Sequence, residues 1–148
     1  VLRCADVLSP SAHGALQAYL SSRLCLRPLG YDPMLNVLSL EDLSLALSLA
    51  ADSSATGIFN IPGCDTLPLS ELIHAAHRLG VPIPGPLIGP MYALRARLAP
   101  NRFDYASDRT RLHYGAVVDG SKARRLLGYQ PSSAIRLDQL FERRADAP

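Results

Sequence analysis

The chain has 148 residues, of which 48% are hydrophobic and 19% are charged. A chain of this length and composition forms one ordinary globular domain, which excludes collagen, a coiled coil or disorder as a description of the whole sequence. The formal net charge is +2. This excess is too small for a protein that binds nucleic acid mainly by neutralising phosphates, so we predict no nucleic-acid partner.

The sequence also lacks the signals of a membrane span and of a disulfide framework. No apolar run approaches the ~20 residues that cross a bilayer, and no basic-then-apolar leader opens the chain. The three cysteines, Cys4, Cys25 and Cys64, are widely spaced and form no C-x-x-C. We therefore predict no membrane partner and a soluble protein of the reducing cytoplasm.

The first half of the chain predicts strands that alternate with helices. The predicted strands are 1–8, 34–40 and 58–61, and the predicted helices are 11–24 and 39–51. Ser39 followed three residues later by Asp42 has the form of a capping box, which marks the start of the second helix.

The second half begins with the clearest amphipathic pattern. From Leu69 the apolar residues recur at i, i+3, i+4 and i+7, and Gly80 is suited to end that helix. The four prolines and two glycines of residues 81–90 predict a stiff connector without regular structure. The remaining predictions are a helix over 91–98, a loop over 99–110, a strand end at 117–118, a helix over 121–127 that Asp119 caps and Gly128 ends, and a last helix from 135 to about 144. This alternation predicts an α/β fold.

We find no catalytic motif in the residues themselves. The ten glycines never stand two apart, so the dinucleotide fingerprint G-x-G-x-x-G cannot form. The single lysine, Lys122, does not follow any tyrosine at the four-residue spacing of a Tyr-Lys proton-transfer pair. The run G-A-V-V-D-G-S-K differs from a phosphate-binding loop because Ser121 separates the second glycine from the lysine.

A metal site is also not predicted. His74 and His77 stand three apart on the predicted amphipathic helix, but no acidic residue or cysteine has a spacing that supplies a third ligand. We interpret both histidines as ordinary surface residues.

Four segments resemble, in order, the C-terminal half of the extended short-chain dehydrogenase/reductase family, the NAD-dependent epimerase/dehydratases. The order and spacing of these segments, which extend from residue 2 to residue 131, carry the resemblance. Residues 2–10, L-R-C-A-D-V-L-S-P, resemble the family motif R-x-x-N-V-x-G-P, and residues 36–42, N-V-L-S-L-E-D, resemble f-i-h-V-x-D. Residues 57–63, G-I-F-N-I-P-G, resemble G-x-x-y-N-x-g-g. Residues 118–131, V-D-G-S-K-A-R-R-L-L-G-Y-Q-P, resemble d-x-s-K-a-r-x-L-L-G-y-x-P.

The resemblance implies the last strands of a doubly wound, Rossmann-like sheet plus a small α/β substrate-binding lobe. Residues 1–148 would be the C-terminal part of such a domain, and the N-terminal half would hold the glycine-rich cofactor loop and the Tyr-x-x-x-Lys pair. NAD or NADP is then the cofactor of the complete protein, and we expect neither to bind this chain alone.

The same resemblance implies the site residues. Cys4 and Ala5 would border the cofactor, and Asp6 would border the substrate. Apart from the resemblance, Arg109 of the polar segment before the last predicted helices is a second candidate for substrate contact. Arg109 and its neighbour Arg111 can clamp an anion or lie on a solvated surface. Asp6 stands where the family usually has Asn, and Leu35 stands near the position where sugar-nucleotide members often have Arg; both departures favour a less charged carbonyl or hydroxyl substrate.

Two functional hypotheses follow. The first is the substrate-binding portion of an NAD(P)-dependent epimerase, dehydratase or reductase that acts on a sugar nucleotide or another hydroxyl or carbonyl compound. Its partners would be the small-molecule substrate and the N-terminal half of the same protein, and a homodimer is a further arrangement. The second is a non-catalytic binding or regulatory module derived from that family.

Overall fold

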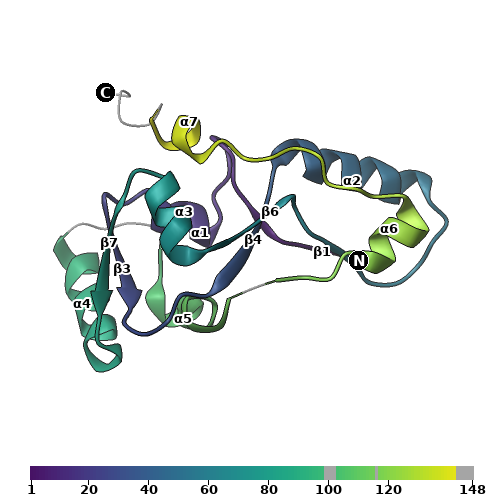
Figure 1. The fold of residues 1–148 in the computed structure, drawn as a ribbon. Helices are drawn as coiled ribbons and strands as arrows, with labels where there is room; N and C mark the ends of the chain where they lie inside the picture. Colours follow the sequence, from purple (N-terminus) through teal and green to yellow (C-terminus); the bar gives the residue numbers. More distant parts are fainter. Residues whose placement is uncertain (99–102, 116, 143–148) are drawn as a thin grey trace.

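The computed structural model describes residues 1–98, 103–115 and 117–142 of the chain (Figure 1). Its seven described strands are short, and helices separate most of them. The elements in chain order are β1 (Leu2–Cys4), β2 (Asp6–Val7), α1 (Ala15–Leu20), β3 (Leu24–Pro28), β4 (Met34–Leu38), α2 (Leu40–Asp52), β5 (Phe59–Ile61), β6 (Asp65–Pro68), α3 (Leu69–Ala75), β7 (Leu79–Ile83), α4 (Gly85–Leu98), α5 (Tyr105–Tyr114), α6 (Ser121–Leu127) and α7 (Leu137–Glu142).

The described strands form three small sheets in which parallel pairing dominates. β1 pairs with β5 and β3 pairs with β7, both in parallel. The third sheet has the order β2-β4-β6, with β2 parallel and β6 antiparallel to β4. Parallel strands joined through helices define a mixed α/β fold, as the sequence predicts.

The predicted buried strand over residues 1–8 is two strands in the structure. Ala5 separates β1 from β2, and its backbone N–H donates to the Ile61 carbonyl at 3.0 Å. After Ala5 the chain leaves β5 and pairs with β4, where Asp6 lies opposite Val37. The strand is also less buried than predicted, since Arg3 and Cys4 are exposed.

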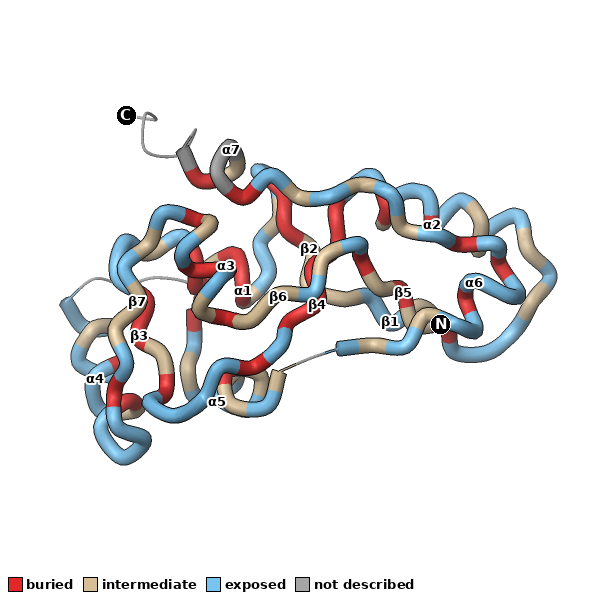
Figure 2. Tube along the Cα trace, viewed as in Figure 1, coloured by how far each residue is buried: buried red, intermediate tan, exposed pale blue. Residues whose placement is uncertain are grey.

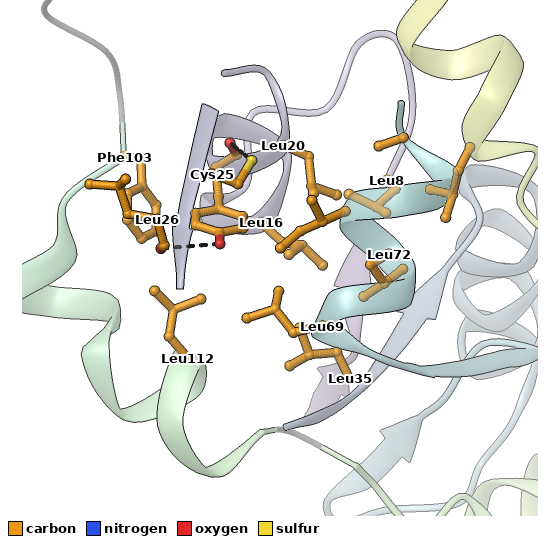
Figure 3. Close-up of a cluster of buried hydrophobic side chains, with 14 of the residues drawn as sticks. Leu8, Leu16, Leu20, Cys25, Leu26, Leu35, Leu69, Leu72, Phe103 and Leu112 are labelled. Carbon is orange, nitrogen blue, oxygen red and sulfur yellow. Dashed lines mark hydrogen bonds between the residues drawn. The ribbon is translucent and has the colours of Figure 1, made fainter. Parts of the chain in front are cut away.

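Two hydrophobic cores lie at opposite ends of the molecule (Figure 1). The smaller, which we call the sheet core, lies among β5, α2 and α6 and contains Leu38, Ala46, Phe59, Ile61, Ala123, Leu127 and Tyr129. The larger, which we call the lobe core, joins α1, β3, α3, α4 and α5; Figure 3 shows its leucines with Cys25 and Phe103. The chain thus has a sheet part and a lobe, and in the described residues the core of the lobe is the larger of the two.

Local signals account for the helix ends that the sequence predicts correctly. The Ser39 side chain accepts a hydrogen bond from the Asp42 N–H at 3.0 Å and so caps α2. At the end of α6, Gly128 adopts a left-handed conformation with φ 70°, which a glycine reaches without strain. At both positions, residues close together in the sequence determine where the helix begins or ends.

Proline-rich and polar segments are where the predictions are wrong. Residues 81–90 are not an irregular connector, because they contribute to β7 and α4. β7 pairs only with β3 in the described structure, so Pro82 can lie in a strand with one open edge. The predicted loop over 99–110 contains the start of α5, and its residues 99–102 lie outside the described residues, as does the end of the last predicted helix.

Two smaller predictions also fail. α3 ends at Ala75, the turn that follows contains His77 with a positive φ of 52°, and Gly80 lies inside β7 instead of ending the helix. The strand end at 117–118 does not form among the described residues, although Asp119 does accept the Ser121 N–H at 2.9 Å in front of α6.

The segment that follows α6 runs back along the sheet and is fixed by buried polar groups. The Asp42 carboxylate is almost fully buried and accepts hydrogen bonds from the backbone N–H groups of Ser132 and Ser133. The Tyr129 hydroxyl donates to the Pro62 carbonyl at 2.6 Å. These bonds close the sheet core from the C-terminal side.

The turn after β5 is in close contact with the backbone of β4. The Asn36 side chain accepts from the Gly63 N–H at 2.7 Å and donates to the Gly63 carbonyl at 3.2 Å. A Cβ atom on Gly63 would collide with the carbonyl oxygen of Val37. The position therefore requires glycine for space and not for backbone conformation.

We predict that Gly63→Ala lowers the free energy of unfolding by about 3 kcal/mol, because the obstructing atom belongs to backbone that cannot rotate away. Urea denaturation measures this difference. Gly85→Ala is the matched control, since nothing lies near its added Cβ, and should change stability by less than about 1 kcal/mol. Equal effects of the two substitutions would contradict the packing argument.

Candidate functional site

The candidate site lies at the carboxyl ends of the parallel strands β1 and β5. Because the two strands run in the same direction, Cys4 at the end of β1 lies opposite Ile61 at the end of β5. Ala5 and Asp6 follow directly, at the point where the chain changes its pairing partner. Open α/β sheets bind their ligands at such carboxyl edges. The structure thus brings the three N-terminal candidates Cys4, Ala5 and Asp6 to one edge.

Asp6 forms an ion pair across the molecule with Arg111 of α5. One guanidinium nitrogen, Nη1, donates to Asp6 Oδ1 at 2.9 Å. The Asp6 side chain is only 11% exposed and that of Arg111 is 39% exposed. The contact joins the strand segment of the sheet to the lobe, over 105 positions of sequence.

Burial and neighbouring charges act in opposite directions on Asp6. Burial raises the pKa of its carboxyl above the ordinary value, the Arg111 guanidinium lowers it, and the Asp108 carboxylate raises it again. Because burial is the largest of these effects, the net direction is upward. The carboxylate is held in a setting that is costly for a negative charge even with an arginine beside it.

The ends of α5 determine where Arg111 lies. Asp104 caps the helix by accepting from the Ala106 N–H at 3.0 Å. At the other end Gly115 has φ 76° and approaches Met34 of β4 so closely that a Cβ would collide with the Met34 carbonyl oxygen. α5 is therefore fixed against β4, next to the strand that carries Asp6.

Arg109 and Arg111 belong to the same helix but have different surroundings. Two residues correspond to about 200° around a helix, so the two side chains leave α5 on different faces. Arg109 is exposed and acts electrostatically on the Tyr105 hydroxyl, lowering a pKa that partial burial raises. The arginine in contact with Asp6 is Arg111. Sequence reasoning treated this region as a loop, and without the helix nothing separated the two arginines.

The other sequence candidates have simple surroundings. Cys4 is exposed, and partial burial raises the pKa of its thiol, so it is not prepared as a thiolate nucleophile. His74 and His77 are both exposed. Among the described residues no three His, Cys, Asp or Glu side chains gather as a metal site would require, and no helix has the length and hydrophobicity to cross a bilayer.

Comparison with protein sequences gives distant relatives without assigned function. No family model matches the chain. Uncharacterised proteins of Mycobacterium tuberculosis and Mycobacterium bovis are each 33% identical to it over 155 residues. The match covers 100% of this chain and 40% of each relative. The chain therefore spans less than half the length of the proteins that it matches.

Comparison with solved structures gives a consistent fold. UDP-glucose 4-epimerase of Thermus thermophilus, in complex with NAD, matches with a TM-score of 0.62 and 16% identity, over 99% of this chain and 46% of that one. UDP-glucuronic acid 4-epimerase of Bacillus cereus matches with a TM-score of 0.59 and 14% identity, over 95% and 42%. L-threonine 3-dehydrogenase of Trypanosoma brucei matches with a TM-score of 0.56 and 17% identity, over 96% and 43%.

These matches define the fold of the chain. It is a mixed α/β structure like the Rossmann-like NAD-dependent epimerases and dehydrogenases, and it corresponds to less than half of each of those proteins. At these identities the similarity concerns the fold, and the predicted class of an α/β, Rossmann-like structure is confirmed.

The raised pKa of Asp6 predicts a pH-dependent stability difference. Its folded state holds the proton more tightly than the unfolded chain, so this contribution is present below the ordinary carboxyl pKa and is lost as pH rises through the folded value. Asp6→Asn cannot ionise. We therefore expect the stability of this variant, relative to the unsubstituted chain, to increase from pH 3 to pH 7 in urea denaturation.

Asp104→Asn provides a control of opposite sign on the same region. Hydrogen bonds from Ser107 and Ala106 lower the pKa of the exposed Asp104 carboxyl, so the stability of this variant relative to the unsubstituted chain should decrease over the same pH range. The same trend in both variants would show that burial does not dominate the environment of Asp6.

Proposed function

We propose that this chain is the substrate-binding C-terminal portion of an NAD(P)-dependent epimerase, dehydratase or reductase. The observation that carries the proposal is the parallel β1–β5 pair, which presents Cys4, Ala5 and Asp6 at its carboxyl edge within a fold that matches less than half of several NAD-dependent enzymes. The substrate would be a hydroxyl or carbonyl compound, with sugar nucleotides as one class because two of the similar structures are UDP-sugar epimerases.

The residues of this edge suit a flat cofactor ring beside them. Cys4 is exposed and Ala5 half-buried, and both side chains are small, so they leave room for a nicotinamide. NAD or NADP bound there would accept a hydride from the substrate. We propose Cys4 and Ala5 as cofactor contacts and Asp6 as the substrate contact; Arg109, on the exposed face of α5, stays a prediction for substrate contact.

The partner that we propose is the N-terminal half of the same protein. Among the described residues β1 pairs only with β5, so its other edge is open to a further strand. α2, which packs on the same core as Leu2 of β1 and is largely exposed on its other side (Figure 2), carries exposed leucines that a monomer would normally bury. We call this surface the leucine face of α2; its residues are Leu40 and Leu47, which lie two turns apart on the same side of the helix. An added strand and the helix that precedes it would cover both features.

A non-catalytic module of the same origin is the second candidate. The observation that favours it is the position of the single lysine, whose ammonium lies 4.8 Å from the centre of the Phe59 ring and so acts on packing. This chain then contains no lysine that could assist a tyrosine in proton transfer. The two candidates differ in whether the complete natural protein binds a nicotinamide cofactor.

We predict that the 148-residue chain does not bind NAD(H) and that the complete natural protein does. Pyrophosphate binding in this fold depends on a glycine-rich turn at a helix N-terminus, which this sequence does not contain. Calorimetric titration with NADH and NADPH measures both proteins under the same conditions. Micromolar binding by the short chain, or no binding by the complete protein, would overturn the proposal.

The 148-residue chain should also self-associate at high concentration, because an open strand edge and exposed leucines favour contact between copies. Leu47→Glu should weaken this association in sedimentation velocity experiments. Leu29→Glu is the matched control, since Leu29 has a similar exposure, 57% against 54%, and lies beyond β3 at the other end of the molecule. A monomer at all concentrations, or equal effects of both substitutions, would contradict the assignment of the covered surface.

A further inference from the structure

The charges at the carboxyl edge of the sheet are unusual for a site that would hold a phosphate. Phosphate sites offer arginine or lysine side chains whose donors are free to face the ligand. Here Arg111, the arginine that contacts Asp6, already donates to the Asp6 carboxylate at 2.9 Å. Asp108, one helical turn before Arg111, is close enough to raise the pKa of Asp6 by its charge. These three side chains together carry one net negative charge at neutral pH.

We propose that the Asp6–Arg111 pair is the specificity determinant of this edge and excludes substrates that carry a phosphate or diphosphate there. This inference rests on the proposed function and narrows it: the substrate group that lies against Asp6 is a hydroxyl, a carbonyl or another group without negative charge. The similar UDP-sugar epimerases then share the fold of this chain and differ from it in this part of the site.

The exclusion has two physical parts. To bind a diphosphate, the Arg111 guanidinium would have to release Asp6, which would leave a carboxylate that is only 11% exposed without its partner. The released carboxylate would also face the anionic ligand at short range, where repulsion is weakly screened by solvent. A hydroxyl or carbonyl group avoids both penalties, because it can form hydrogen bonds to Asp6 or Arg111 while the ion pair stays intact.

The position of Asp6 makes this a property of the site and not of the surface. Asp6 follows the carboxyl end of β1 and is the first residue of β2, which pairs with β4, so that Asp6 lies opposite Val37. Arg111 is fixed by α5, whose end at Gly115 is held against Met34. Neither partner belongs to a terminus, so the pair is set by the packing of the lobe against the sheet.

The test is calorimetric titration of the complete natural protein with inorganic pyrophosphate and with UDP, in the presence of excess NADH to occupy the proposed cofactor site. We expect weak binding, and at least tenfold tighter binding of both probes by Asp6→Asn, because the substitution keeps the shape of the side chain and frees the charge of Arg111. The double variant Asp6→Asn with Arg111→Gln should lose the gain. Asp108→Asn, which leaves the ion pair in place, should give a smaller gain in the same direction and serves if Asp6→Asn does not fold.

Asp104→Asn is the matched control for a general change of charge. It removes one carboxylate from the same helix, and Asn remains a good helix cap, so probe affinity should change less than twofold. Tight binding by the unsubstituted protein, or equal gains from Asp104→Asn and Asp6→Asn, would overturn the inference. The titration requires no turnover, and NADH binding is measured separately, so a failure of the proposed function, seen as absent NAD(H) binding, is distinguishable from a failure of this inference.

Discussion

The structure depends on the six residues 2–7, which form β1 and β2 and belong to two sheets. Backbone hydrogen bonds allow a strand one partner on each side, and Ala5 is where the segment exchanges β5 for β4. This exchange connects the sheet core with the lobe core and leaves Asp6 between them. The candidate site exists because the chain changes partners at that point.

Buried polar groups keep the two cores in register. Asn36 holds the turn after β5 against β4, Asp42 holds the segment after α6, and the Asp6–Arg111 pair holds α5 against the start of the chain. Each bond joins residues far apart in the sequence. The free energy of one buried hydrogen bond is modest, but a broken one leaves a desolvated polar atom, so these contacts select one arrangement of sheet and lobe.

The sequence predicted those elements whose signals are local. The Ser39 cap, the strand that begins at Met34 and the Gly128 stop each depend on a few adjacent residues, and all three are confirmed. β3 and β7 were missed because each is a short strand that contains proline and forms only by pairing with the other. α5 was missed because its sequence is polar, and its helix depends on the Asp104 cap and on Gly115 against β4. Without that helix the two arginines Arg109 and Arg111 could not be distinguished, so Arg111 was not singled out as the partner of Asp6, and substrate contact by Arg109 stays a prediction.

We propose that β1 is an internal strand of a larger sheet in the complete protein. Val1 and Ala5 bond to β5 through their carbonyl and N–H groups, and alternation along the strand directs the N–H groups of Leu2 and Cys4 to the opposite side. Amide hydrogen exchange, measured for the complete natural protein and for the 148-residue chain at low concentration, reports on that side directly. We predict that the Leu2 and Cys4 amides exchange at least a hundredfold more slowly in the complete protein, while the Ala5 amide is protected in both. Equal exchange of the Leu2 and Cys4 amides in the two proteins would contradict this proposal.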